Sequence, residues 1–360
     1  MKGLIASGGR GTRLRPITHT RNKHLIPIAN KPILHYALEN MAEAHVREVA
    51  VIVPKGEREV PLAIGDGARW GLHIAYIEQE APLGLAHCVR IAEDFIGSEP
   101  FIFYLGDNMV LGGLRGFVEK FQKERCNCLL TIATVKDPER FGVPELRDGR
   151  IVSIEEKPAH PKSRYAVAGI YIYDSSIFQA VRAIKPSKRG ELEISDAHQY
   201  LLDKGCRVSY AEISGWWKDT GKPADLLEAN ALVLSAIKTR IDGEVDDKSV
   251  LTGHVIVEHG AKVINSRIRG PVAIGAGSVI ENSYIGPSTS VYTGCRIKQS
   301  EIEFSLILAD CCIADIGVRI EESIIGDGSQ VFGGRHGGQA GGKPRTHRLT
   351  IGDQCVLEIA

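Results

Sequence analysis

The sequence predicts an α/β protein in which a mainly parallel sheet is followed by a parallel β-helix. Two observations carry this prediction. Short apolar runs alternate with helical stretches up to about residue 240, whereas after about residue 245 helical periodicity stops and aliphatic residues recur every five or six positions. A chain of 360 residues is long enough for two ordinary domains. We therefore expect one domain over residues 1–240 and a second over residues 241–360.

The first domain alternates candidate strands with candidate helices. Continuous apolar strands separated by helices are typical of a mainly parallel sheet covered on both faces. In such sheets the ligand lies at the carboxyl ends of the strands. The expected strands are 2–6, 48–53, 73–77, 101–105, 129–134, 151–155, 169–173 and 207–212, and the expected helices are 33–44, 86–95, 114–124 and 223–237.

The second domain repeats with a step of 17 residues. Three aliphatic positions per step describe a three-sided coil with one inward residue on each face, which is the hexapeptide repeat of a parallel β-helix. Because each coil contacts only its neighbours, the domain suits assembly or scaffolding, and we expect a homo-oligomer. The three registers are Val257, Ile274, Val291, Leu308 and Ile325; Val263, Ile280, Ile297, Ala314 and Val331; and Ile268, Ile285, Ile302 and, after a slip of one residue, Ile320.

A glycine-rich stretch at about residues 333–346 interrupts this repeat. Such a composition is typical of a flexible connection, so we expect a loop there. The pair Ile351-Gly352 resembles the Ile-Gly pairs of the earlier coils and indicates that the repeat resumes after the loop.

Composition excludes several classes of partner. Lys plus Arg and Asp plus Glu both total 44, so no overall field favours nucleic acid or a membrane surface. No apolar run approaches the roughly 18 residues of a membrane span, and the stretch after Lys2 is too short for a signal peptide. The eight cysteines show no paired C-x-x-C spacing, which argues against zinc. We expect a cytoplasmic protein with reduced thiols.

The stretch "SGGRGTRLRP" begins at Ser7, directly after the first expected strand. It lacks the third glycine of the dinucleotide fingerprint and the G-x-x-x-x-G-K-[ST] pattern of a P-loop. What remains is a glycine turn with arginines, whose backbone amides and guanidinium groups can hold phosphate oxygens. Taken alone, the stretch is equally compatible with an ordinary turn carrying solvated arginines, and the roles of Arg10 and Arg15 stay open between these two interpretations.

The longer run "SGGRGTRLRPITHTRNKHLIPIANKP" resembles the signature of sugar-1-phosphate nucleotidylyltransferases. Further motifs of that family follow in order: "EQEAPLGLAH", "YLGDNMV", "FGVPEL", "EEKP", "GIYIYD", "RGELEISDA" and "WWKDTG". The resemblance spans almost the whole chain and is greatest for the long-form glucose-1-phosphate thymidylyltransferases. It implies a Rossmann-like nucleotidyltransferase domain followed by a left-handed β-helix.

The resemblance also implies a reaction. A sugar-1-phosphate oxygen attacks the α-phosphorus of a nucleoside triphosphate, and pyrophosphate leaves. Because the second pKa of a phosphate monoester lies near ~6, the nucleophile is already anionic at pH 7 and needs no general base. We expect glucose-1-phosphate as the sugar substrate and dTTP as the nucleotide; UTP stays open, because the two bases differ by one methyl group worth only about 1–3 kcal/mol.

The site residues implied by the resemblance fall into three groups. Arg13 and Lys23 match the cations of the triphosphate and of the transferring phosphoryl group, and Asp107 and Asp219 match a pair that binds Mg²⁺. The nucleotide site comprises Gly8, Gly9, Gly11 and Thr12 at the phosphates and Gln79 and Gly84 at the base. The sugar-phosphate site comprises Gly142, Glu156, Lys157 and Ala168.

Two other functions are weighed against this interpretation. A bifunctional enzyme would add an amino-sugar acetyltransferase in the β-helix, and such sites commonly use a histidine base. A silent homologue typically lacks the metal aspartates or the phosphate cations, so it is disfavoured by the presence of Arg13, Lys23, Asp107, Lys157 and Asp219. The histidines available to an acetyltransferase are His254, His259, His336 and His347, none in a recognisable context.

Overall fold

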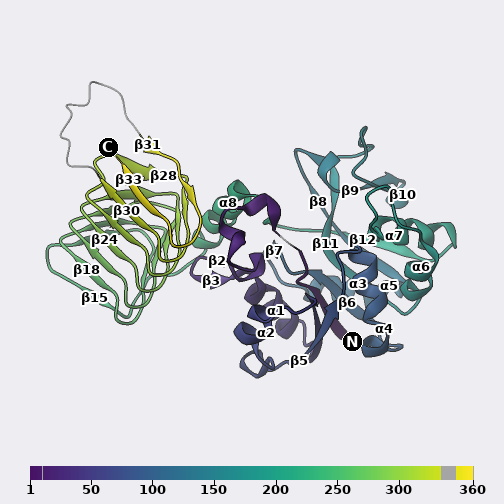
Figure 1. Cartoon of the computed structure of the whole chain (residues 1–360). Coiled ribbons are helices and arrows are strands. Elements are labelled where there is room, and N and C mark those ends of the chain that lie inside the picture. Colours follow the sequence, from purple (N-terminus) through teal and green to yellow (C-terminus); the bar gives the residue numbers. More distant parts are fainter. Residues whose placement is uncertain (10, 334–345, 360) are drawn as a thin grey trace. The chain divides into compact units, whose positions relative to one another are not determined.

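The computed structural model describes residues 1–9, 11–333 and 346–359 (Figure 1). Arg10, His336 and the expected loop in the glycine-rich stretch, except at its ends Gly333 and Thr346, lie outside the described residues. The chain forms two compact units. Unit 1 combines Met1–Gly9 with Ile33–Asp219, and unit 2 combines Arg10–Pro32 with Thr220–Ala360.

Unit 1 is built on a seven-stranded sheet that is mainly parallel, as predicted. Its strand order is β12-β8-β11-β6-β1-β4-β5, and only β11 runs antiparallel to its two neighbours. The central strands are fully buried because helices cover the sheet, which explains their continuous apolar sequence. The strands are β1 (Lys2–Ala6), β4 (Glu48–Pro54), β5 (His73–Gln79), β6 (Phe101–Leu105), β8 (Cys128–Thr134), β11 (Tyr165–Tyr173) and β12 (Val208–Glu212).

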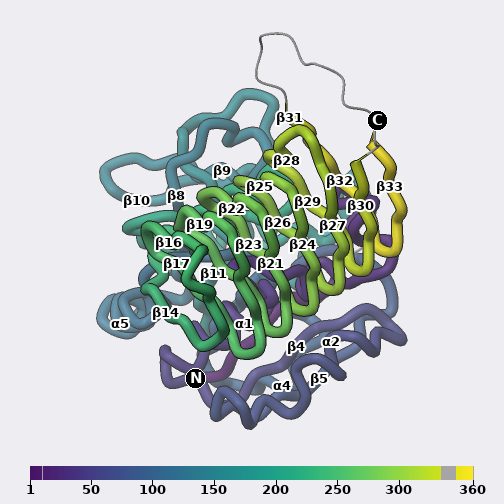
Figure 2. Tube along the Cα trace, turned by 90° about the vertical axis from the view of Figure 1, so that its left-hand side faces the viewer, coloured from purple at the N-terminus to yellow at the C-terminus, as the bar shows by residue number. Residues whose placement is uncertain are grey.

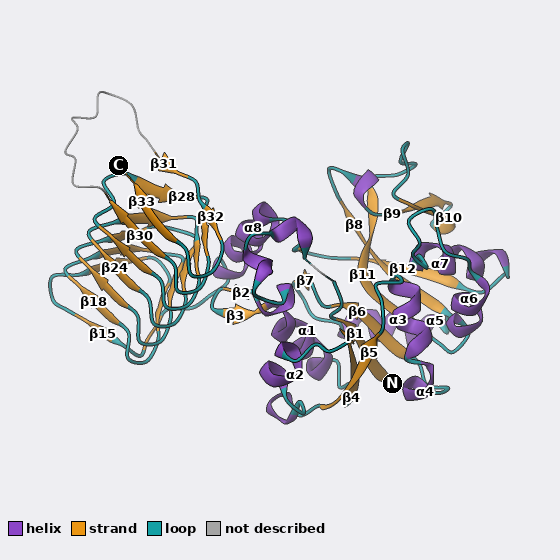
Figure 3. Cartoon of the chain, viewed as in Figure 1, coloured by secondary structure: helices purple, strands orange, loops and turns teal. Residues whose placement is uncertain are grey.

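Several helices of unit 1 contribute buried apolar side chains to the core of this sheet, and Figure 3 shows the helices against the strands. The expected helix 86–95 is two helices, α3 and α4, which meet at Ala92. The helices α2, α6 and α7 were not predicted, and α6 and α7 pack with α3. The helices are α1 (Ile33–Glu43), α2 (Glu59–Ile64), α3 (Leu85–Ile91), α4 (Glu93–Ile96), α5 (Arg115–Glu124), α6 (Ile177–Ala183) and α7 (Ile194–Asp203), with single turns η4 (Ala68–Trp70) and η5 (Pro138–Arg140).

Two antiparallel ribbons extend from the sheet of unit 1. The expected strand 151–155 is real but does not join the large sheet: β10 (Arg150–Glu156) pairs with β9 (Gly142–Arg147). Its partially exposed, alternating burial fits a two-stranded ribbon better than a central parallel strand. The second ribbon joins β7 (Asn108–Val110) to β13 (Trp217–Asp219).

The C-terminal part of unit 2 is the predicted β-helix (Figure 2). Three parallel sheets form its faces, and the inward aliphatic residues pack into one buried core. The first face holds β14 (Arg240–Ile241), β17 (Val255–Val257), β20 (Val272–Ile274), β23 (Thr289–Val291), β26 (Leu306–Ile307), β29 (Ile324–Ile325) and β32 (Thr350–Ile351). The second holds β15 (Glu244–Val245), β18 (Lys262–Ile264), β21 (Val279–Glu281), β24 (Arg296–Lys298), β27 (Cys312–Ala314), β30 (Gln330–Gly333) and β33 (Val356–Ile359). The third holds β16 (Val250–Thr252), β19 (Arg267–Arg269), β22 (Tyr284–Ile285), β25 (Glu301–Glu303), β28 (Arg319–Glu321) and β31 (Thr346–His347).

The repeat register is confirmed except in the coil that begins at β26. There Val291 pairs with Ile307, not Leu308, and Ile297 pairs with Ile313, not Ala314. The corner after β25 is one residue shorter than the preceding one, and the strands keep their hydrogen-bonded register while the corner absorbs the change. The third register, including Ile320, and the resumption at Ile351 are as expected.

Unit 2 also contains the helix α8 (Pro223–Leu234) and residues 11–32, here called the N-terminal segment. The proline at the start of α8 has no amide hydrogen to satisfy, as is typical of a first helical turn. The N-terminal segment consists of short turns and one hairpin: η1 (Thr12–Leu14), η2 (Ile17–His19), η3 (Lys23–Leu25), β2 (Pro27–Ile28) and β3 (Lys31–Pro32).

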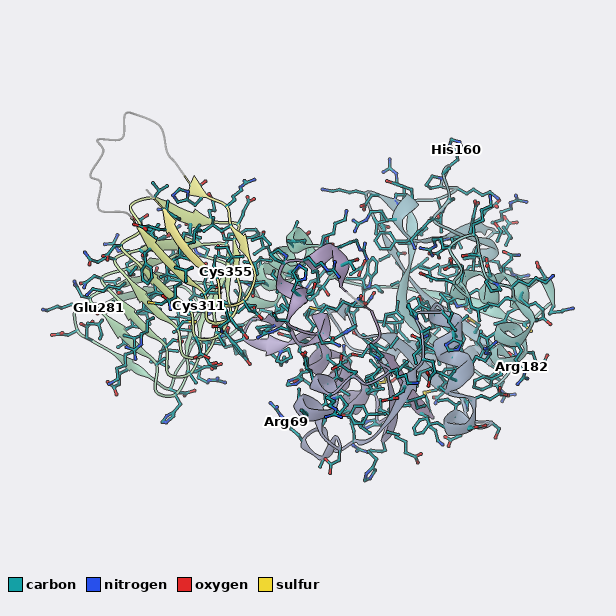
Figure 4. The ribbon with its side chains drawn as sticks, viewed as in Figure 1. Arg69, His160, Arg182, Glu281, Cys311 and Cys355 are labelled. Atoms are coloured by element: carbon teal, nitrogen blue, oxygen red, sulfur yellow. The ribbon has the colours of Figure 1, made fainter. Side chains whose placement is uncertain are left out.

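All eight cysteines are free, and five of them are buried. Figure 4 marks Cys311 within the β-helix, where the structure places its sulfur 3.0 Å from the carbonyl oxygen of Gly326. Within the described ranges, no helix has both the length and the apolar character needed to cross a membrane.

Candidate active site

The predicted base-reading residues meet at the carboxyl ends of strands in unit 1. Gln79 is the last residue of β5, Gly8 follows β1, and Gly84 directly precedes α3. Gln79 is 7% exposed, and its Oε1 lies 3.4 Å from the position that a Cβ on Gly8 would occupy. Gly8 and Gly84, two of the predicted nucleotide residues, therefore lie beside the side-chain amide of a third, Gln79.

Hydrogen-bond partners fix the orientation of the Gln79 amide. Its Nε2 lies 3.3 Å from the carbonyl oxygen of Gly84 and 3.1 Å from Nδ1 of His87. A carbonyl oxygen can only accept, so the amide group facing Gly84 must be the donor, NH₂. Burial, and then the charge of Arg90, lowers the pKa of His87 and keeps a neutral ring whose Nδ1 can accept. Oε1 is consequently the face of Gln79 directed toward Gly8.

Gly84 occupies a position that excludes a side chain. Its φ is +96°, and a Cβ there would lie 2.5 Å from the carbonyl oxygen of Leu192. The same carbonyl accepts a hydrogen bond from the amide of Ala86, and the amide of Leu192 donates to Leu83. The loop before α3 is thereby held against the backbone that leads into α7.

The two predicted metal carboxylates come together on the ribbon of β7 and β13. Asp107 directly precedes β7, and Asp219, the last residue of β13, pairs with Asn108. Two aspartates that are 112 positions apart in the chain thus lie at neighbouring positions of one two-stranded ribbon. Asp107 also follows β6, so it lies at the carboxyl edge of the large sheet.

Asn108 organises this ribbon, and the sequence interpretation assigned it no role. Its Nδ2 donates to Asp107 Oδ1 at 2.9 Å. Its Oδ1 accepts from Trp217 Nε1 at 2.6 Å and from the amide of Gly169 at 3.1 Å. The buried amide therefore links both strands of the ribbon to β11, and it sets the position of the carboxylate beside it. "YLGDNMV" contained this residue, but only the contacts reveal its function.

The carboxylate pair fits a magnesium ion that is shared with phosphate groups. Magnesium is commonly held by one or two carboxylates together with substrate phosphates and water. Among the described residues, no cluster of three or more His, Cys, Asp or Glu side chains is arranged to hold a metal. Two carboxylates, Asp107 and Asp219, match the way in which magnesium is usually bound together with phosphates and water. They are too few for a site in which the protein supplies all the metal ligands.

The predicted sugar-phosphate residues lie where β9 begins and β10 ends. Ser195 Oγ donates to Glu156 Oε2 at 2.7 Å, and a Cβ on Gly142 would lie only 2.6 Å from that hydroxyl. Lys157 Nζ lies 2.9 Å from Glu156 Oε1, and 43% of the lysine side chain is exposed. The structure therefore groups Gly142, Glu156 and Lys157 and adds Ser195, which the sequence interpretation missed.

Arg189 is a second cation at this group. Its Nη2 lies 3.7 Å from Glu156 Oε1 and 2.8 Å from Glu193 Oε2. The motif "RGELEISDA" contains Arg189, Glu193 and Ser195. Its place among the other motifs indicated the family, but the sequence did not show which of its side chains lie near Glu156.

Ala168, the fourth predicted sugar-site residue, is fully buried on β11. It precedes Gly169, whose amide donates to Asn108. Further along β11, the pKa of Tyr171 is raised by burial first and then by the charges of Glu156, Asp107 and Asp219. The charges of the two predicted metal carboxylates and of the predicted sugar-site carboxylate therefore all raise the pKa of the same buried phenol.

The remaining predicted residues, apart from Gly9, belong to unit 2. Gly11 has a φ of +56° and begins the turn η1, which contains Thr12 and Arg13. A Cβ on Gly11 would lie 3.3 Å from Cβ of Lys23, so the glycine turn and the start of η3 are in contact. Gly11, Thr12, Arg13 and Lys23 are therefore grouped, while Gly8 and Gly9 end the first stretch of unit 1.

Comparison with known proteins identifies relatives over the whole chain. The chain is 50% identical to the glucose-1-phosphate thymidylyltransferase of Streptomyces antibioticus, over 100% of this chain and 99% of the relative. A solved structure of a putative glucose-1-phosphate thymidylyltransferase from Bacillus anthracis in complex with a sucrose is 39% identical. It covers 67% of this chain and 97% of its own, with a TM-score of 0.63.

A UDP-glucose pyrophosphorylase solved with UDP-glucose is 27% identical, with a TM-score of 0.59 over 66% of this chain and 99% of its own. The family model described as "Nucleotidyl transferase" matches residues 2–236, which include every site residue discussed above. By this match and by its full-length relatives, the chain belongs to the nucleotidyl transferase family.

Proposed function

We propose that this protein transfers a nucleoside monophosphate from dTTP, or from UTP, to glucose-1-phosphate. An oxygen of the sugar phosphate forms a bond to the α-phosphorus, and the bond from that phosphorus to the α–β bridging oxygen breaks. The products are a nucleoside diphosphate sugar and pyrophosphate. The names of the relatives and the grouping of the site residues both support this assignment.

Binding and alignment supply most of the catalysis in this proposal. The nucleophile is already an anion, so the protein has to hold two polyanions in line and to stabilise the transferring phosphoryl group. Lys157 holds the phosphate of the sugar, and Glu156 accepts hydrogen bonds from sugar hydroxyls. Arg13 and Lys23 neutralise the triphosphate, and Gln79 Oε1 accepts from N3–H of the pyrimidine base.

Members of this family generally use a divalent metal, and the proposed metal is magnesium. Asp107 and Asp219 would hold it, and when bound it supplies positive charge to the phosphate oxygens. Asn108 keeps the carboxylate of Asp107 in place through a hydrogen bond of 2.9 Å. Trp217 supports the same arrangement because its indole nitrogen donates to Asn108.

The observation that carries the proposal is the pairing of Asp219 with Asn108. It brings two motifs whose aspartates lie 112 positions apart in the chain to one edge of the sheet. A structural turn at Asp107 alone would need no second carboxylate at that position.

A pyrophosphate-release assay over a matrix of substrates tests the proposal. The nucleotides are dTTP, UTP, dCTP and ATP, and the sugars are glucose-1-phosphate, N-acetylglucosamine-1-phosphate, galactose-1-phosphate and mannose-1-phosphate. We expect the highest kcat/KM for dTTP or UTP with glucose-1-phosphate. Absence of pyrophosphate release with every pair would contradict the proposed function.

Three accompanying expectations stay predictions: a homo-oligomer, a cytoplasmic location and a functional domain boundary near residue 240. The oligomeric state is measured by analytical ultracentrifugation of the purified chain. Any role of the β-helix in acetyl transfer is tested with acetyl-CoA and glucosamine-1-phosphate.

A further inference from the structure

The N-terminal segment is held by the β-helix, although more than 200 residues separate them in the chain. This segment carries Arg13 and Lys23, the two cations assigned to the triphosphate. Its regular structure consists of turns of three residues and one short hairpin. Elements this short have few internal hydrogen bonds, so their position depends on contacts with the rest of unit 2.

The first set of contacts joins two aspartates of neighbouring coils to the N-terminal segment. Asp327 follows β29, and Asp353 follows β32, at the same corner of the β-helix. Asp327 Oδ2 forms an ion pair with Arg21, and Asp353 Oδ2 accepts from Thr20 Oγ1 at 2.5 Å. The side chains of Arg21 and Asp327 are only 17% and 24% exposed, so solvent screens this pair less than an open surface pair.

Each aspartate uses its other oxygen to hold a coil. Asp327 Oδ1 accepts from the amide of Ala309 at 2.8 Å, and Asp353 Oδ1 accepts from the amide of Asp327 at 2.8 Å. One carboxylate oxygen therefore fixes the corner, and the second faces the N-terminal segment. A side chain held at one end by the backbone is a rigid partner for the group at its other end.

The second set of contacts holds the hairpin at the far end of the N-terminal segment. Asn230 of α8 is fully buried, and its Oδ1 accepts from the amide of Ala29 at 2.8 Å and from Ser290 Oγ at 2.7 Å. Its Nδ2 donates to the carbonyl oxygen of Ser288 at 2.9 Å. Asn30 Nδ2 donates to the carbonyl oxygen of Val291 at 2.9 Å. The β-helix and α8 thus hold the hairpin turn through four hydrogen bonds that involve Asn230 and Asn30.

We propose that the β-helix positions the triphosphate-binding cations, and that Arg21 and Asp327 are positioning residues for Lys23. Lys23 begins η3 two residues after Arg21, so a shift of Arg21 moves the lysine directly. The proposal rests on the proposed function, because it takes Lys23 and Arg13 to contact the triphosphate. A misplacement of about 1 Å in such a site can cost about 100-fold in rate.

The test uses variants on the β-helix, far along the chain from the segment they affect. Asp327→Asn and Asp353→Asn keep Oδ1 as an acceptor for the coil and replace the charged oxygen that faces the N-terminal segment with an NH₂ group. We expect kcat/KM for dTTP to fall about 10-fold or more in Asp327→Asn, with the KM for glucose-1-phosphate unchanged within about two-fold. The double variant Arg21→Gln/Asp327→Asn should lose no more than Asp327→Asn alone, because both substitutions break the same contact and Asn keeps the acceptor for Ala309.

Glu301→Gln is the matched control, because it removes an ion pair with Arg319 that lies wholly within the β-helix. Its kinetics should equal those of the wild type. Wild-type kinetics in both aspartate variants would overturn the positioning role. An equal loss toward both substrates with a large fall in Tm would also overturn it, because that pattern indicates general destabilisation. A wild-type chain that releases no pyrophosphate would instead contradict the proposed function, and the positioning role with it.

Discussion

The side-chain amide of Gln79 lies 3.1 Å from Nδ1 of His87, and both side chains are buried. With the carbonyl of Gly84, this contact holds the NH₂ group inward and directs Oε1 toward Gly8. In the proposed function, an oxygen in that place would accept from N3–H of thymine or uracil. Cytosine has an acceptor at N3, so it would need the opposite orientation of the amide.

His87 should therefore determine selectivity between pyrimidine bases. In His87→Leu one of the two acceptors for Nε2 is lost, and only the Gly84 carbonyl still holds the amide. The ratio of kcat/KM for dTTP over dCTP should then fall about 5-fold, as expected for the loss of about 1 kcal/mol of hydrogen-bond preference. His87→Gln offers a carbonyl acceptor and should keep most of the selectivity. Steady-state kinetics with both nucleotides measure the ratio, and an unchanged ratio in His87→Leu contradicts the role.

Gly84→Ala should destabilise unit 1 through a direct clash. A Cβ would lie 2.5 Å from the carbonyl oxygen of Leu192, and overpacking of this kind costs about 1–3 kcal/mol in addition to the strain of a positive φ. Gly97→Ala is the control, because Gly97 also has a positive φ but has no atom within 4 Å of its added Cβ. Thermal unfolding should show a larger fall in Tm for Gly84→Ala; equal shifts in Tm would remove the steric argument.

Lys157→Gln should weaken sugar-phosphate binding selectively. A charge-assisted hydrogen bond contributes about 1.5–3 kcal/mol, so the KM for glucose-1-phosphate should rise about 10- to 100-fold while that for dTTP changes little. Lys162→Gln is the matched control, since Lys162 also pairs with a glutamate, Glu145, at 2.8 Å. The assignment is wrong if both lysine variants change the two KM values alike.

His198 makes the stability of the protein depend on acid pH. It is fully buried with Nε2 2.6 Å from Tyr173 Oη, and burial lowers its pKa to about 3. An unfolded histidine takes a proton below pH about 6.5, whereas the folded one stays neutral until about 3. His198 therefore lowers the free energy of unfolding as the pH falls below about 6.5, by at most about 1.4 kcal/mol per pH unit, and has no effect above it.

His198→Phe keeps an aromatic ring and removes the titration. Between pH 7.5 and 5.5, urea denaturation should show the wild type losing about 1.4 kcal/mol more stability than the variant. Between pH 7.5 and 8.5 the two proteins should show the same pH dependence. Parallel stability curves over the acid range would mean that the folded imidazole takes up a proton as readily as the unfolded one.

The architecture was largely predictable because its determinants are periodic. Inward residues of a β-helix must recur at each coil, so a 17-residue step specifies the faces. The step failed at Leu308 and Ala314 because a corner can lose a residue while the strands keep their register through Ile307 and Ile313. A prediction from a fixed 17-residue step cannot show where a corner is one residue shorter.

The site was predictable only as a set of motifs. Family order indicated Asp107 and Asp219, but their meeting depends on an antiparallel pairing between short strands far apart in the chain. The contacts of Asn108, Ser195 and His87 depend on side-chain directions in the folded protein. For the same reason the aspartates that hold the N-terminal segment look, in the sequence, like ordinary corner residues of a β-helix.

In the proposed function, Asp107 and Asp219 support metal-dependent nucleotidyl transfer at the edge of the unit 1 sheet. Asp107→Asn keeps an oxygen that can accept from Asn108 but removes the charge that would hold magnesium. Asp203→Asn is the control, because Asp203 lies at the end of α7 and accepts an exposed hydrogen bond from Gln199 at 2.8 Å.

The decisive measurement is pyrophosphate release from dTTP and glucose-1-phosphate at saturating Mg²⁺ in these two variants and the wild type. We expect Asp107→Asn to lose about 100- to 1000-fold in kcat with an unchanged Tm, Asp203→Asn to match the wild type, and EDTA to abolish wild-type activity until Mg²⁺ is restored. Wild-type activity in Asp107→Asn, or full activity in EDTA, would contradict the role of these aspartates in metal-dependent transfer.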